Sequence, residues 1–311
     1  MNAKAFFTHP LGLMISAAGA AFLWGSAFPF IKLSYEKLDI KPDEIGEQLL
    51  FAGYRFLLAG LLVYFIFRLL KKDMKLRRVH IVTLVKIGVV QTFFQYVFFY
   101  IGLSYSTGIQ GSIIAGTTSL FQIIIAHFMY EDDRVNRMKS IGLLIGFSGV
   151  ILVNLPKGDL QLSFGIGEIL LLFAMVSGAY GNILARNGSQ KMDVIYLTSY
   201  QMILGSLGLV VIGGVTSGFF PFTFDMQSFM ILLYLAFLSA AGFILWNNVM
   251  KYNQVGKVSL YLFLIPVFGV ILSAILLDET LHYIVFLGLA LVVSGIIIVN
   301  RPAVKQQEKD S

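Results

Sequence analysis

Residues Leu276–Asn300 read LLDETLHYIVFLGLALVVSGIIIVN, where an acidic pair ends one apolar run and a second run follows at once. Residues Tyr130–Asn154, YEDDRVNRMKSIGLLIGFSGVILVN, follow the same plan. Such internal similarity predicts that the chain holds two copies of one fold. At a constant offset of 146, Asp132, Gly142, Leu143, Ser148, Gly149, Ile151, Val153 and Asn154 recur as Asp278, Gly288, Leu289, Ser294, Gly295, Ile297, Val299 and Asn300.

The composition is that of a membrane protein. Of the 311 residues, 57% are hydrophobic and only 13% are charged, whereas a soluble domain carries about 25% charged residues. The mean hydropathy is +0.81. A soluble globule of this size has too little interior for so much apolar surface, so lipid is the expected solvent. The chain has no cysteine, which excludes disulfides, iron–sulfur clusters and thiolate zinc sites.

Ten apolar segments come close to the roughly 20 residues that spanning a bilayer requires. The connections between them are short, and only the tail 301–311, PAVKQQEKDS after Arg301, is predicted to be disordered, on the cytoplasmic side. The predicted fold class is therefore an all-α integral membrane protein with ten transmembrane helices. The predicted spans are 11–34, 47–68, 79–103, 108–130, 138–155, 164–186, 194–217, 228–250, 256–277 and 282–300.

The positive charges predict which side of the membrane each connection occupies. With a cytoplasmic amino terminus, seventeen lysines and arginines fall in the inside connections and termini, and four fall outside, at Lys32, Lys37, Lys41 and Lys157. Cytoplasmic connections carry the excess of Lys and Arg, so both termini are predicted to be cytoplasmic. The net charge of +6 therefore reflects the positively charged residues that orient the chain in the membrane. The expected partner is the lipid bilayer, and no nucleic acid is expected to bind.

The duplication predicts an inverted pair of repeats. The offset of 146 maps segment 108–130 onto 256–277 and segment 138–155 onto 282–300. Five spans in each half is an odd number, so the second copy lies upside down. The predicted repeats are 1–155 and 156–300. Two inverted copies can exchange conformations and open a midplane site to either side of the membrane in turn.

Three stretches carry a resemblance to a known family: AFLWGSAFPFIK at Ala21–Lys32, YRF at Tyr54–Phe56, and LFLIPVFGVILSAILLDETL at Leu262–Leu281. They resemble the EamA-type transporters of the drug/metabolite transporter superfamily, and the resemblance covers the whole chain. It implies two five-helix repeats and export of amino acids or other metabolites, with uptake in some members. One departure is that Leu120 stands where the second half has Pro266, so the two halves need not kink alike.

Aromatic and amide side chains recur deep in several spans. Gln91 and Gln95 are four residues apart and share one helix face. Aromatic rings beside a few orienting amides are typical of a ligand pocket. The alternatives are amides that join neighbouring helices and aromatics that form interfacial belts. The residues predicted to bind substrate, around one midplane cavity near Pro266, are Trp24, Gln91, Gln95, Tyr96, Tyr180, Asn182, Trp246 and Asn247.

Arg55 and Pro266 stand out within apolar spans. A charge at the depth of Arg55 usually faces the bundle interior or water. It could bind a substrate carboxylate through its bidentate fork, or it could be a structural tie to carbonyl groups or to an acidic residue at the outer rim such as Glu47. The resemblance to the EamA-type transporters implies the structural role. Pro266 removes a backbone hydrogen bond, which fits either a hinge or cavity-lining break or a tolerated kink; the resemblance to the EamA-type transporters favours the hinge or break.

Few titratable groups lie inside the predicted spans. Glu168 and His127 lie toward span ends, where an interfacial role is the simpler interpretation, and they are the candidates for proton coupling, Glu168 first. No Asp or Glu lies deep in the spans, so facilitated transport or loose proton coupling is predicted. The acidic turns at 131–133 and 278–279 lie too near the interface to be predicted substrate sites.

No metalloprotease, serine hydrolase or P-loop motif is present in the sequence, so no enzymatic activity, cofactor or metal is predicted. The predicted function is secondary transport of a small metabolite, an amino acid or a related amine or drug-like solute, across the plasma or inner membrane by alternating access. Export is favoured; import or passive exchange is the alternative. A less favoured alternative is a membrane enzyme acting on lipid-linked substrates. Such an enzyme needs acid/base or metal-binding residues gathered at an interface, and the sequence shows no such set. A monomer suffices because both repeats lie in one chain, and an oligomer is left open.

Overall fold

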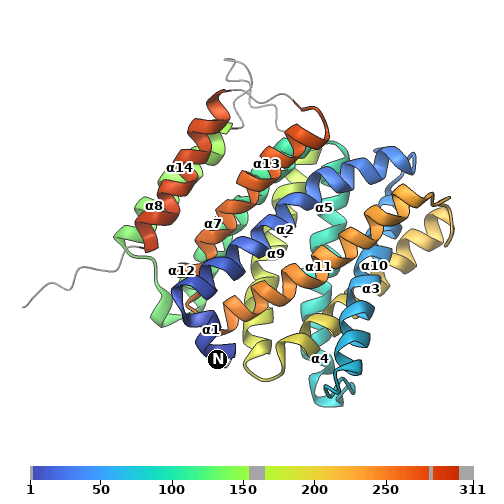
Figure 1. Cartoon of the computed structure of the whole chain (residues 1–311), viewed down its shortest axis with the longest axis horizontal. Coiled ribbons are helices and arrows are strands. Elements are labelled where there is room, and N and C mark those ends of the chain that lie inside the picture. The colour runs from blue at the N-terminus through green and yellow to red at the C-terminus, as the bar shows by residue number, and fades with distance from the viewer. Residues whose placement is uncertain (1–2, 154–164, 280–282, 301–311) are drawn as a thin grey trace, which may run out of the picture.

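The computed structural model describes residues 3–153, 165–279 and 283–300, and every regular element in these ranges is a helix (Figure 1). The predicted all-α class is thereby confirmed. The predicted repeat boundary at 155–156 and the predicted tail 301–311 lie outside the described residues. The elements are α1 (Ala3–Thr8), α2 (Pro10–Lys37), α3 (Ile45–Leu69), α4 (Arg78–Ile87), η1 (Gly88–Phe94), α5 (Gln95–Ser104), α6 (Gly108–Ala115), α7 (Thr117–Met129), η2 (Glu131–Asp133), α8 (Arg137–Val153), α9 (Ile166–Ser189), α10 (Val194–Ser217), α11 (Met226–Tyr252), α12 (Val255–Val258), η3 (Ser259–Phe263), α13 (Leu264–Leu276) and α14 (Tyr283–Asn300).

Eight helical stretches of the described chain are long and apolar enough to cross a membrane. The other two predicted spans correspond to α8 and α14, apolar helices of 17 and 18 residues. The chain is a multi-pass membrane protein, while ten spans, their inversion and the orientation of the termini stay predictions. The eight stretches are Pro10–Lys37, Ile45–Leu69, Arg78–Ser104, Gly108–Met129, Ile166–Ser189, Val194–Ser217, Met226–Tyr252 and Val255–Leu276.

The helices of the two predicted halves pack against one another in corresponding pairs. Helix α3 packs against α10, and α8 packs against α14 at one edge of the bundle (Figure 1). Helix α2 packs against α11 and α13, and its counterpart α9 packs against α5 and α7. Glycines allow the closest approaches: a Cβ on Gly53 would lie 2.7 Å from Val210, and one on Gly295 would lie 2.6 Å from the carbonyl oxygen of Gly142. Small residues at such crossings let membrane helices pack tightly.

The fourth predicted span of each half is interrupted at a corresponding place. In the first half, Gly116 separates α6 from α7, and its N–H donates to the carbonyl of Ile113 at 3.0 Å, a tight 3₁₀-type bond. In the second half, the 3₁₀ segment η3 separates α12 from α13, and the offset of 146 carries Gly116 onto Leu262 within it. The halves therefore break alike although only the second has the proline, Pro266, which lies in the first turn of α13.

The third span contains a feature that the sequence analysis did not predict. Between α4 and α5 the chain forms a π-helical segment, η1. A π-helical turn widens the helix and often marks a functional region. Here it carries Gln91, which is fully buried.

Candidate functional site

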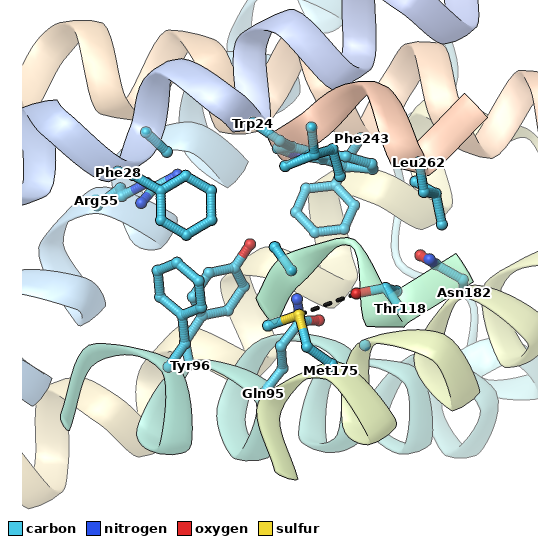
Figure 2. Close-up of a pocket in the computed structure, with 15 residues that line it drawn as sticks. Trp24, Phe28, Arg55, Gln95, Tyr96, Thr118, Met175, Asn182, Phe243 and Leu262 are labelled. Atoms are coloured by element: carbon cyan, nitrogen blue, oxygen red, sulfur yellow. Dashed lines mark hydrogen bonds between the residues drawn. The ribbon is translucent and has the colours of Figure 1, made fainter. Parts of the chain in front are cut away.

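A narrow cavity of about 60 Å³ lies at the centre of the helix bundle (Figure 2). Its volume leaves room for only a few water molecules. Both predicted halves contribute: the first through α2, α3, α5, α6 and α7, and the second through α9, α11, η3 and α13. The lining residues are Trp24, Ala27, Phe28, Arg55, Gln95, Tyr96, Phe99, Ala115, Thr118, Met175, Gly178, Asn182, Phe243, Leu262 and Ile265.

Aromatic rings form much of the wall (Figure 2). The Trp24 ring lies edge-on to Phe243, with centroids 5.2 Å apart, and to Trp246, with centroids 5.8 Å apart. Trp246 is fully buried behind Trp24 and holds it in place. Across the cavity, Tyr96 lies edge-on to Phe99, with centroids 5.8 Å apart. The result is a rigid, mostly apolar chamber of the kind that encloses small ligands.

Arg55 is the cation of this chamber. Its side chain is 1% exposed, and its Nε donates to the Ser239 hydroxyl at 2.8 Å and to the Leu235 carbonyl at 3.2 Å. Its Nη1 donates to the Tyr100 hydroxyl at 3.1 Å. Thus Arg55 is held by the helices α11 and α5, and it also lines the cavity.

No described carboxylate forms an ion pair with Arg55, and this includes Glu47, which the sequence analysis named as an example of an acidic partner. The Nη2 group of Arg55 makes no hydrogen bond with a described residue. A buried cation is costly unless an anion or several acceptors offset its lost hydration. Arg55 has three oxygen acceptors, and its guanidinium carbon lies over the rings of Phe56 and Tyr96, 4.8 and 5.8 Å from their centroids. Its Nη2 group still has no hydrogen-bond partner in the described chain and can meet a solute in the cavity.

A chain of buried amides runs beside the cavity and joins the predicted halves. Gln91 Nε2 donates to Asn182 Oδ1 at 2.7 Å, and Asn182 Nδ2 donates to Gln122 Oε1 at 2.7 Å. Gln122 Nε2 then donates to the Ser259 hydroxyl at 2.6 Å. The sequence analysis did not single out Gln122 or Ser259, although a glutamine deep in an apolar span is a signal that it needs a polar partner.

One amide at the cavity has no partner at all within the described chain. Gln95 lines the cavity, makes no hydrogen bond with a described residue, and its Oε1 is buried. The indole N–H of Trp24 is likewise buried and unpaired. Nearby, the Thr118 hydroxyl donates only to the sulfur of Met175, at 2.9 Å (Figure 2). Buried polar groups are rarely left unpaired, so these groups require water or a polar solute in the cavity as their partner.

The structure brings most, but not all, of the predicted substrate-binding residues together. Trp24, Gln95, Tyr96 and Asn182 line the cavity, while Gln91 and Trp246 stand directly behind it, through the contacts above. The remaining two, Tyr180 and Asn247, do not reach it.

Tyr180 is 42% exposed on the outer side of α9. It is two residues from both Gly178 and Asn182, and two residues turn a helix by about 200°, so a helix that aims these two at the cavity aims Tyr180 away from it. Asn247 instead donates to the Thr198 hydroxyl at 2.9 Å, which joins α11 to α10. Asn247 therefore fits the alternative in which an amide joins neighbouring helices.

Pro266 and the two coupling candidates also lie outside the cavity lining. Pro266 is buried beside Ile265 and one turn after Leu262, which both line it, so the break is adjacent to the chamber. Glu168 accepts hydrogen bonds from the Gly165 N–H at 2.9 Å and from Ser106 at 3.1 Å, and so caps α9. His127 Nδ1 accepts from the Val135 N–H at 3.1 Å. The geometry gives both groups local structural partners at helix ends.

Comparison with protein families finds the same match in both predicted halves of the chain. The EamA-like transporter family model matches the chain twice, at residues 12–155 and 165–301. The chain belongs to the EamA-like transporter family. This places it in the drug/metabolite transporter superfamily that the sequence resembles.

Relatives of this EamA-like transporter carry transporter names. "Uncharacterized transporter YvbV" of Bacillus subtilis is 29% identical over 294 residues, 92% of this chain and 90% of the relative. "Probable amino-acid metabolite efflux pump" of Escherichia coli is 25% identical over 288 residues, 89% of this chain and 90% of the relative. A solved crystal structure superposes with a TM-score of 0.70 at 14% identity, covering 92% of this chain and 96% of its own, and supports the fold alone.

Proposed function

We propose that this protein is a secondary transporter that exports a small metabolite bearing a carboxylate, an amino acid or a close relative, by alternating access. The observation that carries the proposal is Arg55, a buried cation that faces the cavity with one unpaired Nη group and no carboxylate partner in the described chain. A guanidinium binds a carboxylate through two parallel hydrogen bonds. A substrate carboxylate would supply the missing anion.

The other cavity groups complement an amino group on the same solute. Gln95 has an unpaired carbonyl oxygen at the cavity, which can accept a hydrogen bond from an ammonium. The faces of Trp24 and Phe243 can attract the same cation through cation–π interaction. A zwitterion with its carboxylate on Arg55 and its ammonium among these groups would leave no unpaired charge in the chamber.

The alternating-access step is supported by the arrangement of the two halves. The main helix contacts that one predicted half makes have counterparts made by the corresponding helices of the other half. The cavity is lined by helices of both halves. The cavity lining contains no carboxylate or histidine in the described chain. Accordingly, transport is proposed to run on the solute gradient, with proton coupling loose or absent. Export is favoured by the efflux name of the E. coli relative.

Counterflow in proteoliposomes tests the proposal. Vesicles loaded with an unlabelled solute are placed in a trace of the labelled one, and a panel pairs each amino acid with its decarboxylated amine. We expect exchange of at least one amino acid and no exchange of the matching amine. A panel in which only amines exchange would reject carboxylate recognition. Efflux from preloaded cells then reports the direction of transport.

A further inference from the structure

Two carboxylates at opposite ends of the bundle each hold main-chain N–H groups of the other predicted half. At one end, Asp133 Oδ2 accepts from the Gly256 N–H at 2.7 Å, where α12 begins. At the other end, Glu279 accepts from the N–H groups of Gly108 and Ile109, both at 2.8 Å, where α6 begins. Asp133 lies in the first half and holds the second, whereas Glu279 lies in the second half and holds the first.

The two contacts occupy corresponding positions of the duplication. The offset of 146 that aligns the repeated endings carries Asp133 onto Glu279. It also carries Ile109 onto Val255, one residue before Gly256. Each carboxylate therefore meets the beginning of the interrupted span that the other half contributes to the cavity. Both residues belong to the acidic turns that the sequence analysis did not predict to be substrate sites.

The contact at the Asp133 end, which we name the inner clamp, is tightly built. Asp133 is 2% exposed, and its Oδ1 accepts from Lys139 Nζ at 2.5 Å. Lys139 is held further by the carbonyl oxygens of Asp133 and Arg134. A Cβ on Gly256 would lie 2.6 Å from Asp133 Oδ1, so the carboxylate approaches the backbone where only a glycine leaves room.

The outer clamp, Glu279 with Gly108 and Ile109, is a two-bond contact in which each carboxylate oxygen has its own N–H donor. Lys32 of α2 interacts electrostatically with Glu279 without forming an ion pair with it. A Cβ on Gly108 would lie 2.7 Å from the Ser273 hydroxyl oxygen, which shows how closely α6 and α13 approach here. Carboxylate–N–H bonds of this kind are strong but can be exchanged for water.

Both clamps are closed in this structure, and the cavity has room for only a few waters. Alternating access requires one end to open while the other stays closed, and related halves should use related contacts for the two ends. The spans that the clamps hold, α6–α7 and α12–α13, also line the cavity through Ala115, Thr118, Leu262 and Ile265.

We propose that Asp133 and Glu279 are the two gate residues of transport: breaking the Glu279 clamp opens the cavity to the outside, and breaking the Asp133 clamp opens it to the cytoplasm. This inference rests on the proposed transport function for its purpose. Its geometry involves neither Arg55 nor a substrate. Under the positive-inside prediction, the Glu279 end is the outer end and the Asp133 end is the inner one.

Accessibility of a single cysteine tests the gates without any substrate. The chain has no native cysteine, so Ala27→Cys places one reporter in the cavity lining. A membrane-impermeant maleimide is applied to intact cells and, separately, to inside-out vesicles, in Glu279→Gln and Asp133→Asn backgrounds. Each amide loses the charge and turns its NH₂ group toward a donor that the carboxylate accepted from.

We expect Glu279→Gln to raise labelling from outside by about tenfold and to lower it from inside, and Asp133→Asn to do the reverse, the shift expected from losing one charge-assisted hydrogen bond. The matched controls are the neighbouring exposed carboxylates, Asp278→Asn and Asp132→Asn, whose side chains make no hydrogen bond or ion pair with the other half in the described chain. Equal labelling of each clamp variant and its control, or opening to the same side in both, would overturn the proposal.

A second measurement leaves both carboxylates in place, in case either amide variant fails to accumulate. In Gly108→Cys with Ser273→Cys, the two Cβ atoms would lie 3.2 Å apart, so α6 and α13 need to separate by only a few tenths of an ångström to reach the Cβ spacing of a disulfide. Oxidation should block counterflow and reduction should restore it; full transport with the disulfide formed would refute an opening outer clamp. The labelling experiment needs no solute. If no amino acid exchanges in the counterflow panel but the clamp variants still label from opposite sides, the substrate assignment is rejected and the gate proposal stands.

Discussion

Gln91 and Asn182 are joined by a 2.7 Å hydrogen bond between the π-helical segment η1 and helix α9. Asn182 also lines the cavity, so one amide both joins the two predicted halves and faces the proposed substrate site. Its other group donates to Gln122. Removing it therefore affects two helices at once.

The first prediction concerns this amide chain. Asn182→Ala leaves Gln91 Nε2 and Gln122 Oε1 unpaired in a buried place, and each unpaired group costs about 1–3 kcal/mol. We expect a clearly lower unfolding temperature of the detergent-solubilised protein. Asn248→Ala is the matched control, since Asn248 only donates to the Ile244 carbonyl of its own helix. Equal unfolding temperatures for the two variants would contradict the role of the chain.

The second prediction concerns substrate recognition by Arg55. Arg55→Lys keeps the charge but loses the planar fork, so we expect the affinity for a carboxylate solute to fall by roughly tenfold, about 1.4 kcal/mol, and Arg55→Gln to weaken it further. The measurement is equilibrium binding of an amino acid that the counterflow panel identifies. Lys86→Gln, at an exposed cation on another span, is the control and should bind normally. Unchanged binding by Arg55→Gln would show that Arg55 is only a structural tie.

The third prediction separates the two tryptophans. Trp24 lines the cavity, so Trp24→Ala should weaken binding while the protein stays folded. Trp246 is fully buried behind it, so Trp246→Ala should lower stability by roughly 3–5 kcal/mol, as for other large buried side chains. Binding and thermal unfolding are measured on both variants. Tyr180→Ala is the control, because its ring points away from the cavity; weaker binding in that variant would place the site elsewhere.

The fourth prediction concerns topology. Single cysteines are introduced at Lys72, in a predicted inside connection, and at Phe220, in a predicted outside connection, both exposed. An impermeant maleimide applied to intact cells should label Phe220→Cys alone, and permeabilised cells should show both labelled. Labelling of Lys72→Cys in intact cells would reverse the orientation derived from the positive charges.

The sequence by itself determined the class of this protein and the residue types of its chamber. Apolar runs of spanning length require lipid as solvent wherever they fold, and the recurrence at offset 146 is a property of the chain alone. Deep aromatics and amides indicated a pocket, and four of the eight predicted residues line it. Helical periodicity could also have set Tyr180 apart from Asn182, because residues two positions apart point to opposite faces of a helix.

Only the tertiary structure decided which partner each polar group meets. Whether Arg55 is a structural tie or a recognition group depends on Tyr100, Leu235 and Ser239, which are 45 to 184 residues away along the chain. The acidic turns looked interfacial in sequence because nothing local shows that Asp133 reaches Gly256 or that Glu279 reaches Gly108. A hydrogen bond joins atoms only about 3 Å apart, so the partner of each polar group is set by packing between distant segments.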